Sequence, residues 1–158
     1  MIIFNFDVLA KPGKELGARA PEPDGIRLWN MFHEHSLGRL ALVVDQDVDR
    51  DIFEHWLKVN NIKAAMYEVL DVVAPDLKAE KIQRLAMLTG RSDFYIDRDP
   101  LVASQCLRLG IPTLLVLNPY VVLPEWSGQS NSRNWDSLVK EIDRQAIMKA
   151  EKTWGDMQ

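Results

Sequence analysis

Short runs of apolar residues alternate along the chain with segments in which apolar residues recur at helical spacing. Short continuous apolar runs are typical of strands that are buried on both faces of a parallel sheet. The alternation of such strands with helices predicts an α/β fold with right-handed crossovers. The five predicted strands cover residues 2–4, 40–44, 66–69, 94–96 and 113–117.

Four amphipathic helices are predicted between these strands. The first begins near Asp24, and the fourth begins with Asp99 as its N-cap and Pro100 in its first turn. Gly90 and Gly110 are expected to end the third and the fourth helix. The apolar positions expected to face the core are Ile26, Trp29, Met31, Phe32 and Leu37 in the first helix, Ile52, Phe53, Trp56 and Leu57 in the second, Ile82, Leu85, Ala86 and Leu88 or Thr89 in the third, and Leu101, Val102, Cys106 and Leu109 in the fourth.

A fifth helix is expected at about residues 134–152, with an apolar face that packs back on the sheet. The whole chain, residues 1–158, is then most simply one domain. The apolar positions of this last helix are Trp135, Leu138, Val139, Ile142 and Ala146.

Composition narrows the classes of function. A net charge of −4 does not indicate nucleic-acid binding, which needs a basic surface. Only one cysteine is present, Cys106, which excludes an internal disulfide and fits a reducing compartment such as the cytoplasm. No signal peptide is visible, and no apolar stretch approaches the roughly 20 residues of a membrane helix.

Polar residues follow three of the predicted strands, and this is where candidate chemistry gathers. Asn5 and Asp7 follow the first strand at i, i+2 spacing, which places both on one side of it. Ligands of open parallel sheets bind at the carboxyl ends of the strands. An amide is a poor nucleophile and an uncharged metal ligand, so Asn5 is unusual at such a place. The corresponding residues after the second and fourth strands are Asp45 with Asp47 and Asp97 with Asp99.

These strand ends resemble the haloacid dehalogenase-like (HAD) hydrolases, and in particular small phosphatase-like proteins of actinobacterial phages. The resemblance implies a three-layer Rossmann-like fold with a five-stranded parallel sheet, flanked by helices and without a large cap domain. It also implies that the protein is located in the cytoplasm of a host cell if it is phage-encoded. The resemblance rests on IIFNFDVL at 2–9, LVVDQD at 42–47, Lys78, YIDRDP at 95–100, LGIPT at 109–113 and the tail at 134–145.

The resemblance also implies roles for individual residues. In that family an aspartate at the position of Asn5 attacks phosphorus, and an aspartate at the position of Asp7 is the general acid and base. A Ser or Thr at the position of Asp45 holds a phosphoryl oxygen, and a lysine, here Lys78 or its competitor Lys81, neutralises charge. Acidic residues hold Mg²⁺, and the candidates in this chain are Asp7, Asp97 and Asp99.

Three departures from the family pattern point to a site that is inactive or impaired. Asn5 removes the anionic nucleophile, and Asp45 places an anion opposite a phosphate. Like charges about 4 Å apart repel by about 4 kcal/mol at an effective dielectric constant near 20. Arg98 stands where a second acidic residue often follows the first, and its fixed charge competes with a cation.

The sequence therefore predicts a pseudophosphatase that acts as a binding or regulatory module. The alternative is a Mg²⁺-dependent phosphohydrolase that acts on a macromolecular or nucleotide phosphate. Without a cap the site is expected to be open, and an open acidic shelf suits a protein partner. An exposed Trp126 or Trp154 also points modestly to such a partner surface.

Simpler structural roles are expected for the other candidate residues. The acidic residues around Asp49 favour N-capping of a helix over metal binding. His33, His35 and His55 favour surface or core-edge positions over zinc ligation. Cys106 is expected to be a small buried apolar residue.

Overall fold

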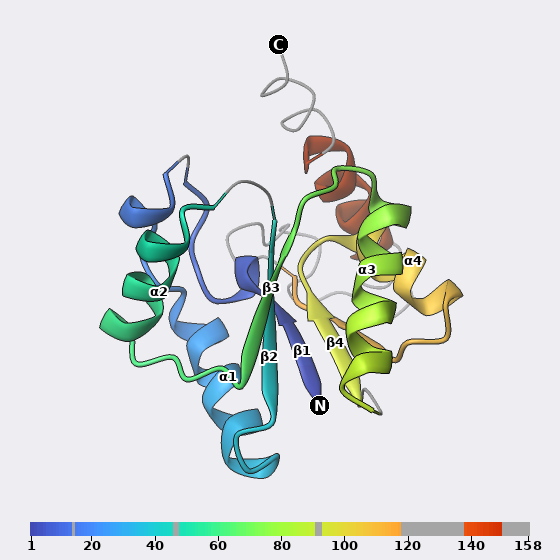
Figure 1. Ribbon diagram of the computed structural model, residues 1–158. Helices are drawn as coiled ribbons and strands as arrows, with labels where there is room; N and C mark the ends of the chain where they lie inside the picture. Colours follow the sequence, from blue (N-terminus) through green and yellow to red (C-terminus); the bar gives the residue numbers. More distant parts are fainter. Residues whose placement is uncertain (14, 46–47, 91–92, 118–137, 150–158) are drawn as a thin grey trace, which may run out of the picture.

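Five parallel strands form one sheet, with the strands in the order β3-β2-β1-β4-β5 (Figure 1). The computed structural model describes residues 1–13, 15–45, 48–90, 93–117 and 138–149. All five predicted strands are confirmed, although the last one ends earlier than expected. The strands are β1 (Ile2–Asn5), β2 (Leu40–Asp45), β3 (Met66–Leu70), β4 (Phe94–Asp97) and β5 (Thr113–Leu115).

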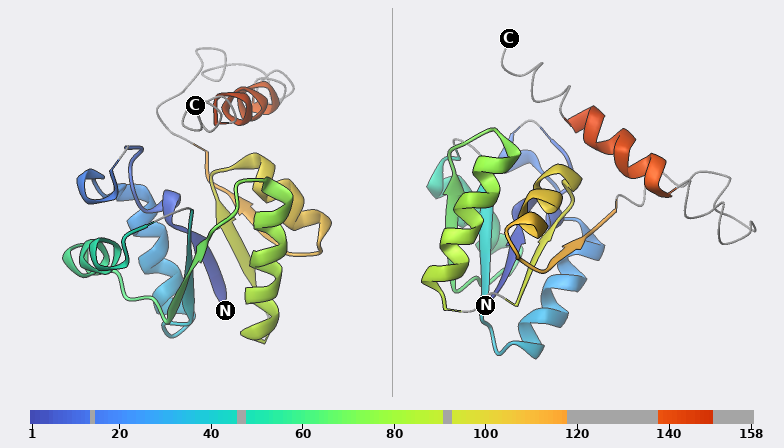
Figure 2. Two further views of the ribbon diagram at one scale, coloured as in Figure 1. Left: turned by 45° about the horizontal axis from the view of Figure 1, so that its top comes forward. Right: turned by 90° about the vertical axis from the view of Figure 1, so that its right-hand side faces the viewer.

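Helices cover both faces of this sheet, so the fold has the three layers of a Rossmann-like protein (Figure 2). Side chains of α1 and α2 share one buried cluster with the sheet, and side chains of α3 and α4 share the other. The helices are α1 (Pro23–His35), α2 (Arg50–Val59), α3 (Pro75–Leu88) and α4 (Pro100–Arg108), with the short 3₁₀ turns η1 (Phe6–Val8) and η2 (Leu16–Ala18).

The side chains of β1 alternate between the two faces of the sheet, and this places the polar end of the strand on one face. Ile2 and Phe4 pack into the cluster of α1 and α2, whereas Ile3 packs into the cluster of α3 and α4. Because side chains alternate along a strand, Asn5 lies on the same side as Ile3. Tyr95 of β4 also belongs to the cluster of α3 and α4. The polar end of β1 is therefore directed to the α3 and α4 side of the sheet.

Helix starts and ends follow the predicted signals. Asp49 caps α2 by accepting hydrogen bonds from two backbone N–H groups, and Asp99 caps α4 by accepting one from Leu101. Gly90 and Gly110 follow α3 and α4 with φ of 93° and 80°. A left-handed conformation of this kind favours glycine, which confirms both as helix terminators.

Some apolar positions expected in the core lie on the surface instead. Met31 is 62% exposed because it lies two residues, about 200° of helical rotation, from the buried Trp29. Leu37 lies beyond α1 and is 88% exposed. Ile52 and Leu88, which occupy the edges of the predicted stripes of α2 and α3, are also exposed. Leu101 and Leu109 of the fourth stripe are exposed in the same way.

Gly25 lets α1 approach the turn that follows β1. A Cβ atom at this position would lie 1.8 Å from the carbonyl oxygen of Val8. No side chain fits at this distance, so glycine is required for the close contact. The contact holds α1 against η1 and thereby fixes the backbone next to Asp7.

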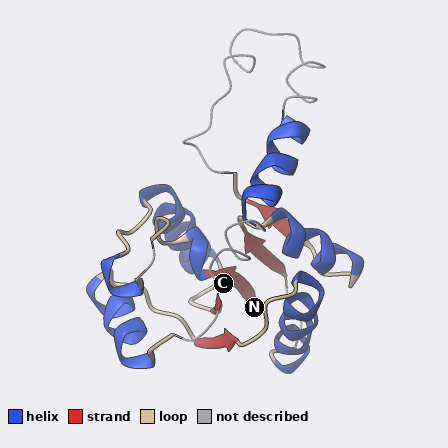
Figure 3. Cartoon of the chain, turned by 90° about the horizontal axis from the view of Figure 1, so that it is seen from above, coloured by secondary structure: helices blue, strands red, loops and turns tan. Residues whose placement is uncertain are grey.

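The last helix does not pack as predicted. Residues 138–149 are helical, and the rest of the expected helix at 134–152 lies outside the described residues. This segment, called helix 138–149 below, lies beyond the carboxyl ends of the strands rather than on a face of the sheet (Figures 1 and 3). Its Lys149 forms ion pairs with Asp7 and Asp99 at these strand ends. The predictions for Asp47, Trp126, Trp135 and Trp154 fall outside the described residues.

In the described parts of the connections there is no inserted cap. Between β1 and β2 the chain forms only η1, η2 and α1, and four residues join β3 to α3. No described helix combines the length and apolar composition that a membrane span requires.

Candidate functional site

The candidate site lies where the strand order reverses. From β1 the chain builds outward to β2 and β3, and then β4 returns to the other side of β1. The crevice beyond the carboxyl ends of β1 and β4 is therefore the topological switch point, where ligands of open α/β sheets bind. Asn5 ends β1, Asp45 ends β2 and Asp97 ends β4, so the fold gathers these three predicted site residues at one edge.

Both the oxygen and the nitrogen of the Asn5 side-chain amide form hydrogen bonds within the fold. Its Oδ1 accepts a hydrogen bond from the backbone N–H of Asp7 at 2.9 Å, and this contact caps η1. Its Nδ2 donates to the hydroxyl of Tyr95 at 3.4 Å. The side chain is buried. The amide thus has a structural role in shaping the turn after β1.

Asp97 is fully buried, and hydrogen bonds reach both of its oxygens. The hydroxyl of Tyr95 donates to Oδ2 at 2.6 Å. The backbone N–H groups of Arg98 and Asp99 donate to Oδ1 at 2.6 Å and 3.0 Å. Burial raises the pKa of Asp97 to about 7, against the opposing effects of Lys149 and of these hydrogen bonds. The Asp97 carboxyl therefore changes its protonation state near neutral pH.

Tyr95 joins Asn5 and Asp97 into one chain of hydrogen bonds. Burial and the neighbouring Asp97 carboxylate raise its pKa well above the ordinary value, so the hydroxyl keeps its proton and donates. Sequence reasoning missed this residue. The available signal was its place two residues before Asp97 on the same strand, which puts both side chains on one face.

Asp45 and Lys78 form an ion pair on the α3 side of the site. Lys78 Nζ lies 3.1 Å from Asp45 Oδ2, and the two side chains are 10% and 20% exposed. Within the described residues, Asp45 Oδ1 has no hydrogen-bond partner. Burial raises the pKa of Asp45, with Lys78 opposing and Asp7 adding to the effect. Of the two candidate lysines, Lys78 pairs with Asp45 at the end of β2, while Lys81 pairs with Asp71, the residue that follows β3.

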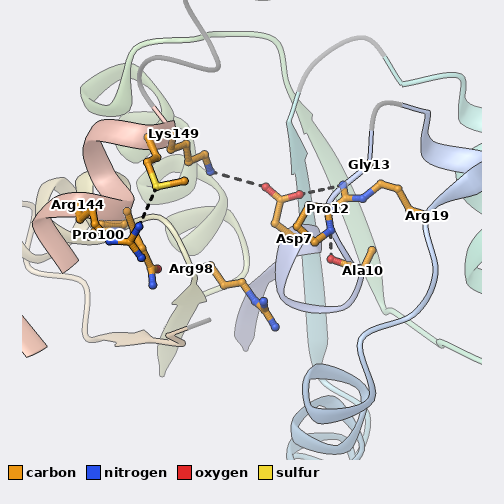
Figure 4. A pocket seen from close by; sticks show the side chains of 11 residues that line it. Asp7, Ala10, Pro12, Gly13, Arg19, Arg98, Pro100, Arg144 and Lys149 are labelled. Atoms are coloured by element: carbon orange, nitrogen blue, oxygen red, sulfur yellow. Dashed lines mark hydrogen bonds and ion pairs between the residues drawn. The ribbon is translucent and has the colours of Figure 1, made fainter. Parts of the chain in front are cut away.

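Asp7 lies between two cations that come from distant parts of the chain (Figure 4). Arg19 Nη1 contacts its Oδ1 at 2.9 Å, and Lys149 Nζ contacts its Oδ2 at 3.7 Å. Burial disfavours the charged form, but the charges of Lys149 and Arg19 outweigh it and lower the pKa of Asp7. Asp7 is therefore held as a carboxylate and is a poor proton donor at neutral pH.

Arg19 is held rigidly against the turn after β1. Its guanidinium also donates to the carbonyl oxygens of Lys11 at 2.7 Å and Ala10 at 3.1 Å, and it lies over the ring of Phe6. The indole N–H of Trp56 donates to the carbonyl oxygen of Arg19 at 2.8 Å. This arginine was missed because the segment around it has no helical or strand period.

A cavity of about 410 Å³ lies between the turn after β1 and helix 138–149 (Figure 4). Four of its described lining residues are basic, and one is acidic. This lining corrects the expectation of an open acidic shelf, because helix 138–149 and Arg19 bring positive charge over the carboxylates. Within the described residues, Nε of Arg98 is buried and has no hydrogen-bond partner. The lining residues are Asp7, Ala10, Pro12, Gly13, Arg19, Arg98, Pro100, Arg144, Gln145, Met148 and Lys149.

The carboxylates as arranged do not fit Mg²⁺, the ion that the family resemblance implies. Mg²⁺ needs near-octahedral coordination by oxygen atoms that are free to bind it. The oxygens of Asp97 accept hydrogen bonds, and those of Asp7 face Arg19 and Lys149. Among the described residues, no group of three or more His, Cys, Asp or Glu side chains is placed to hold a metal ion.

Cys106 lies away from this chemistry. It is fully buried among the side chains that α4 packs on the sheet. Burial raises the pKa of its thiol to about 12, so the reactive thiolate does not form near neutral pH. The expectation of a small buried apolar residue is confirmed.

Two solved structures of the Pnkp1/Rnl/Hen1 RNA repair complex contain a chain of similar fold. In one, the TM-score is 0.59 at 14% identity, over 73% of this chain and 42% of that chain. In the other, the TM-score is 0.61 at 16% identity, over 73% of this chain and 45% of that chain. This protein thus spans less than half the length of either matched chain. No protein-family model matches the sequence, and no curated protein matches it. At such identities the likeness shows the α/β fold alone.

Proposed function

We propose that this protein is a HAD-like pseudophosphatase, a binding module that does not hydrolyse phosphate esters. The observation that carries the proposal is the hydrogen-bond chain from Asn5 through Tyr95 to Asp97. A phosphoryl-transfer site of the HAD kind needs an anionic nucleophile at the first position. Here a neutral amide stands there, and both of its ends are used within the fold.

Internal neutralisation of the acidic residues supports the same proposal. Asp45 is paired with Lys78, and Asp7 is paired with Arg19 and Lys149. Phosphoryl transfer depends on positive charge directed at the oxygens of the substrate. In this site, the positive charges of Lys78, Arg19 and Lys149 neutralise the protein's own carboxylates instead of a substrate.

The basic lining of the cavity indicates the kind of ligand. Arg98, which lies between β4 and α4, and Arg144 of helix 138–149 both line the cavity. The guanidinium of Arg144 is paired with Glu141, so Arg98 is the residue that indicates a ligand, because its buried Nε has no hydrogen-bond partner among the described residues. A guanidinium group presents planar donors that match carboxylate and phosphate oxygens. The module is therefore expected to bind an anionic group, presented by a partner protein or as part of a smaller molecule.

A phosphatase assay tests this proposal. The wild type is incubated with p-nitrophenyl phosphate and Mg²⁺ beside Asn5→Asp, Asp7→Asn and the control Asn30→Asp on the exposed face of α1. The wild type and the control should show no turnover. Turnover gained by Asn5→Asp would indicate that the nucleophile alone is missing, whereas wild-type turnover that Asp7→Asn abolishes would overturn the proposal.

A second candidate function is a Mg²⁺-dependent phosphohydrolase. It is favoured by the fold likeness to chains of an RNA repair complex, together with Asp7, Lys78 and Asp97 at the strand ends. Phosphorylated RNA and DNA ends are the substrates to assay for it, since the described connections after β1 and β3 hold no inserted cap domain. Release of phosphate from such an oligonucleotide, lost in Asp7→Asn, would establish this function.

A further inference from the structure

Lys149 brings a positive charge from helix 138–149 into the acidic cluster. Its Nζ lies 3.2 Å from Oδ2 of Asp99 and 3.7 Å from Oδ2 of Asp7. Asp7 belongs to the turn after β1, and Asp99 begins α4 after β4. One ammonium group therefore bridges both sides of the topological switch point, and Figure 4 shows its approach to Asp7.

The remaining contacts of the two aspartates direct these oxygens to Lys149. Oδ1 of Asp7 accepts from Arg19, and Oδ1 of Asp99 accepts from the backbone N–H of Leu101. In each residue Oδ1 is held by another group of the protein, and Oδ2 faces the same ammonium. The two Oδ2 atoms thus form a small cation site with a lysine in it.

We infer that the Lys149 ammonium is the resident cation of this site, in place of a divalent metal ion, and that it fastens helix 138–149 over the strand ends. An ammonium carries one positive charge and does not need the full oxygen shell that Mg²⁺ demands, so it can form ion pairs with both carboxylates at once. It follows that Lys149 and a divalent ion exclude one another, and a metal binds only when the end of the helix is displaced.

Divalent-ion binding tests this inference directly. Binding of Mn²⁺ to the full chain is measured by calorimetry for the wild type, Lys149→Gln, Lys149→Arg and the control Lys140→Gln, which lies exposed on the same helix. Lys149→Gln should bind Mn²⁺ at least about tenfold more tightly than the other three proteins. The substitution removes a positive charge that repels the metal ion and neutralises the two carboxylates. Equal affinity of the wild type and Lys149→Gln would overturn the inference.

A stability measurement checks the ion pairs without any metal. Thermal unfolding is compared for Lys149→Gln in the wild-type background and in an Asp7→Asn background, each beside Lys140→Gln. The drop in Tm caused by Lys149→Gln should shrink when Asp7 is already neutral. An equal drop in both backgrounds would contradict the bridge. Neither measurement involves a substrate, so each decides this inference whatever the phosphatase assay shows of the proposed function.

Discussion

The Tyr95 hydroxyl lies 2.6 Å from Oδ2 of Asp97, and both side chains are fully buried. This hydrogen bond satisfies a carboxylate that the sequence indicated as a metal ligand. It ties the carboxylate to Asn5 through the same hydroxyl. The end of β4 is thereby stabilised by groups of the protein itself, and several consequences of this arrangement can be measured.

Replacement of Tyr95 by phenylalanine should destabilise the fold. The change keeps the ring but removes the only group that donates to Oδ2 of Asp97 among the described hydrogen bonds. Leaving a buried acceptor unsatisfied costs about 1–3 kcal/mol of the free energy of unfolding. Urea unfolding of Tyr95→Phe measures the loss. Tyr67→Phe is the control, because the Tyr67 hydroxyl bonds Glu54 at an exposed site, and a similar loss in both variants would argue against a special role for Tyr95.

Stability should fall as the pH rises from about 4 to about 7 through the contribution of Asp97. In this range the folded protein keeps a proton on Asp97, whose pKa is about 7, while the unfolded chain has released it from a carboxyl of pKa 3.8. The folded state then binds more protons, so the free energy of unfolding decreases with pH, by at most about 1.4 kcal/mol per pH unit. Urea unfolding at a series of pH values for the wild type and Asp97→Asn measures this slope. A slope that is the same in both proteins would show that Asp97 does not titrate there.

Gly25→Ala should be strongly destabilising, by roughly 3 kcal/mol, because the new methyl group overlaps the Val8 carbonyl and forces α1 away from η1. Gly17→Ala is the matched control. A Cβ at Gly17 meets its nearest neighbour, Ile52, at 3.5 Å, an ordinary contact, so its effect should stay within about 0.5 kcal/mol. Chemical denaturation compares them, and equal stabilities of the two variants would refute the close approach.

Lys78→Met should destabilise the protein by leaving the Asp45 carboxylate without its partner. The loss should fall below the roughly 3–5 kcal/mol of a fully buried broken pair, because Asp45 keeps 20% of its side-chain surface exposed. Adding Asp45→Asn to Lys78→Met should restore part of the stability. Lys81→Met serves as the control, since Lys81 pairs with the exposed Asp71. Additive losses in the double variant would contradict the pairing of Lys78 with Asp45.

The sequence was sufficient for the strands and for most of the helices. Buried parallel strands leave short continuous apolar runs, and residues such as Asp99 and Gly110 mark helix ends by local chemistry. The exposure of Ile52 and Leu88 was not predicted, because the boundary of an apolar stripe depends on which neighbour covers it. That information lies in tertiary packing.

The candidate site was predictable only in part. Asn5, Asp45 and Asp97 come together because they end parallel strands, which the sequence indicates directly. Arg19 and Lys149 contact the same cluster, but only the fold brings these residues from two separate segments to it. The ion pairs of Lys149 join helix 138–149 to the strand ends, and a hydrophobic pattern does not predict such pairs.

Phosphate release by the wild type beside Asp7→Asn in the presence of Mg²⁺ tests most directly whether this site transfers phosphoryl groups. If the site is inactive, both proteins should release phosphate at the same background rate. Mg²⁺-dependent release by the wild type that disappears in a correctly folded Asp7→Asn variant would contradict the proposal that the site is inactive.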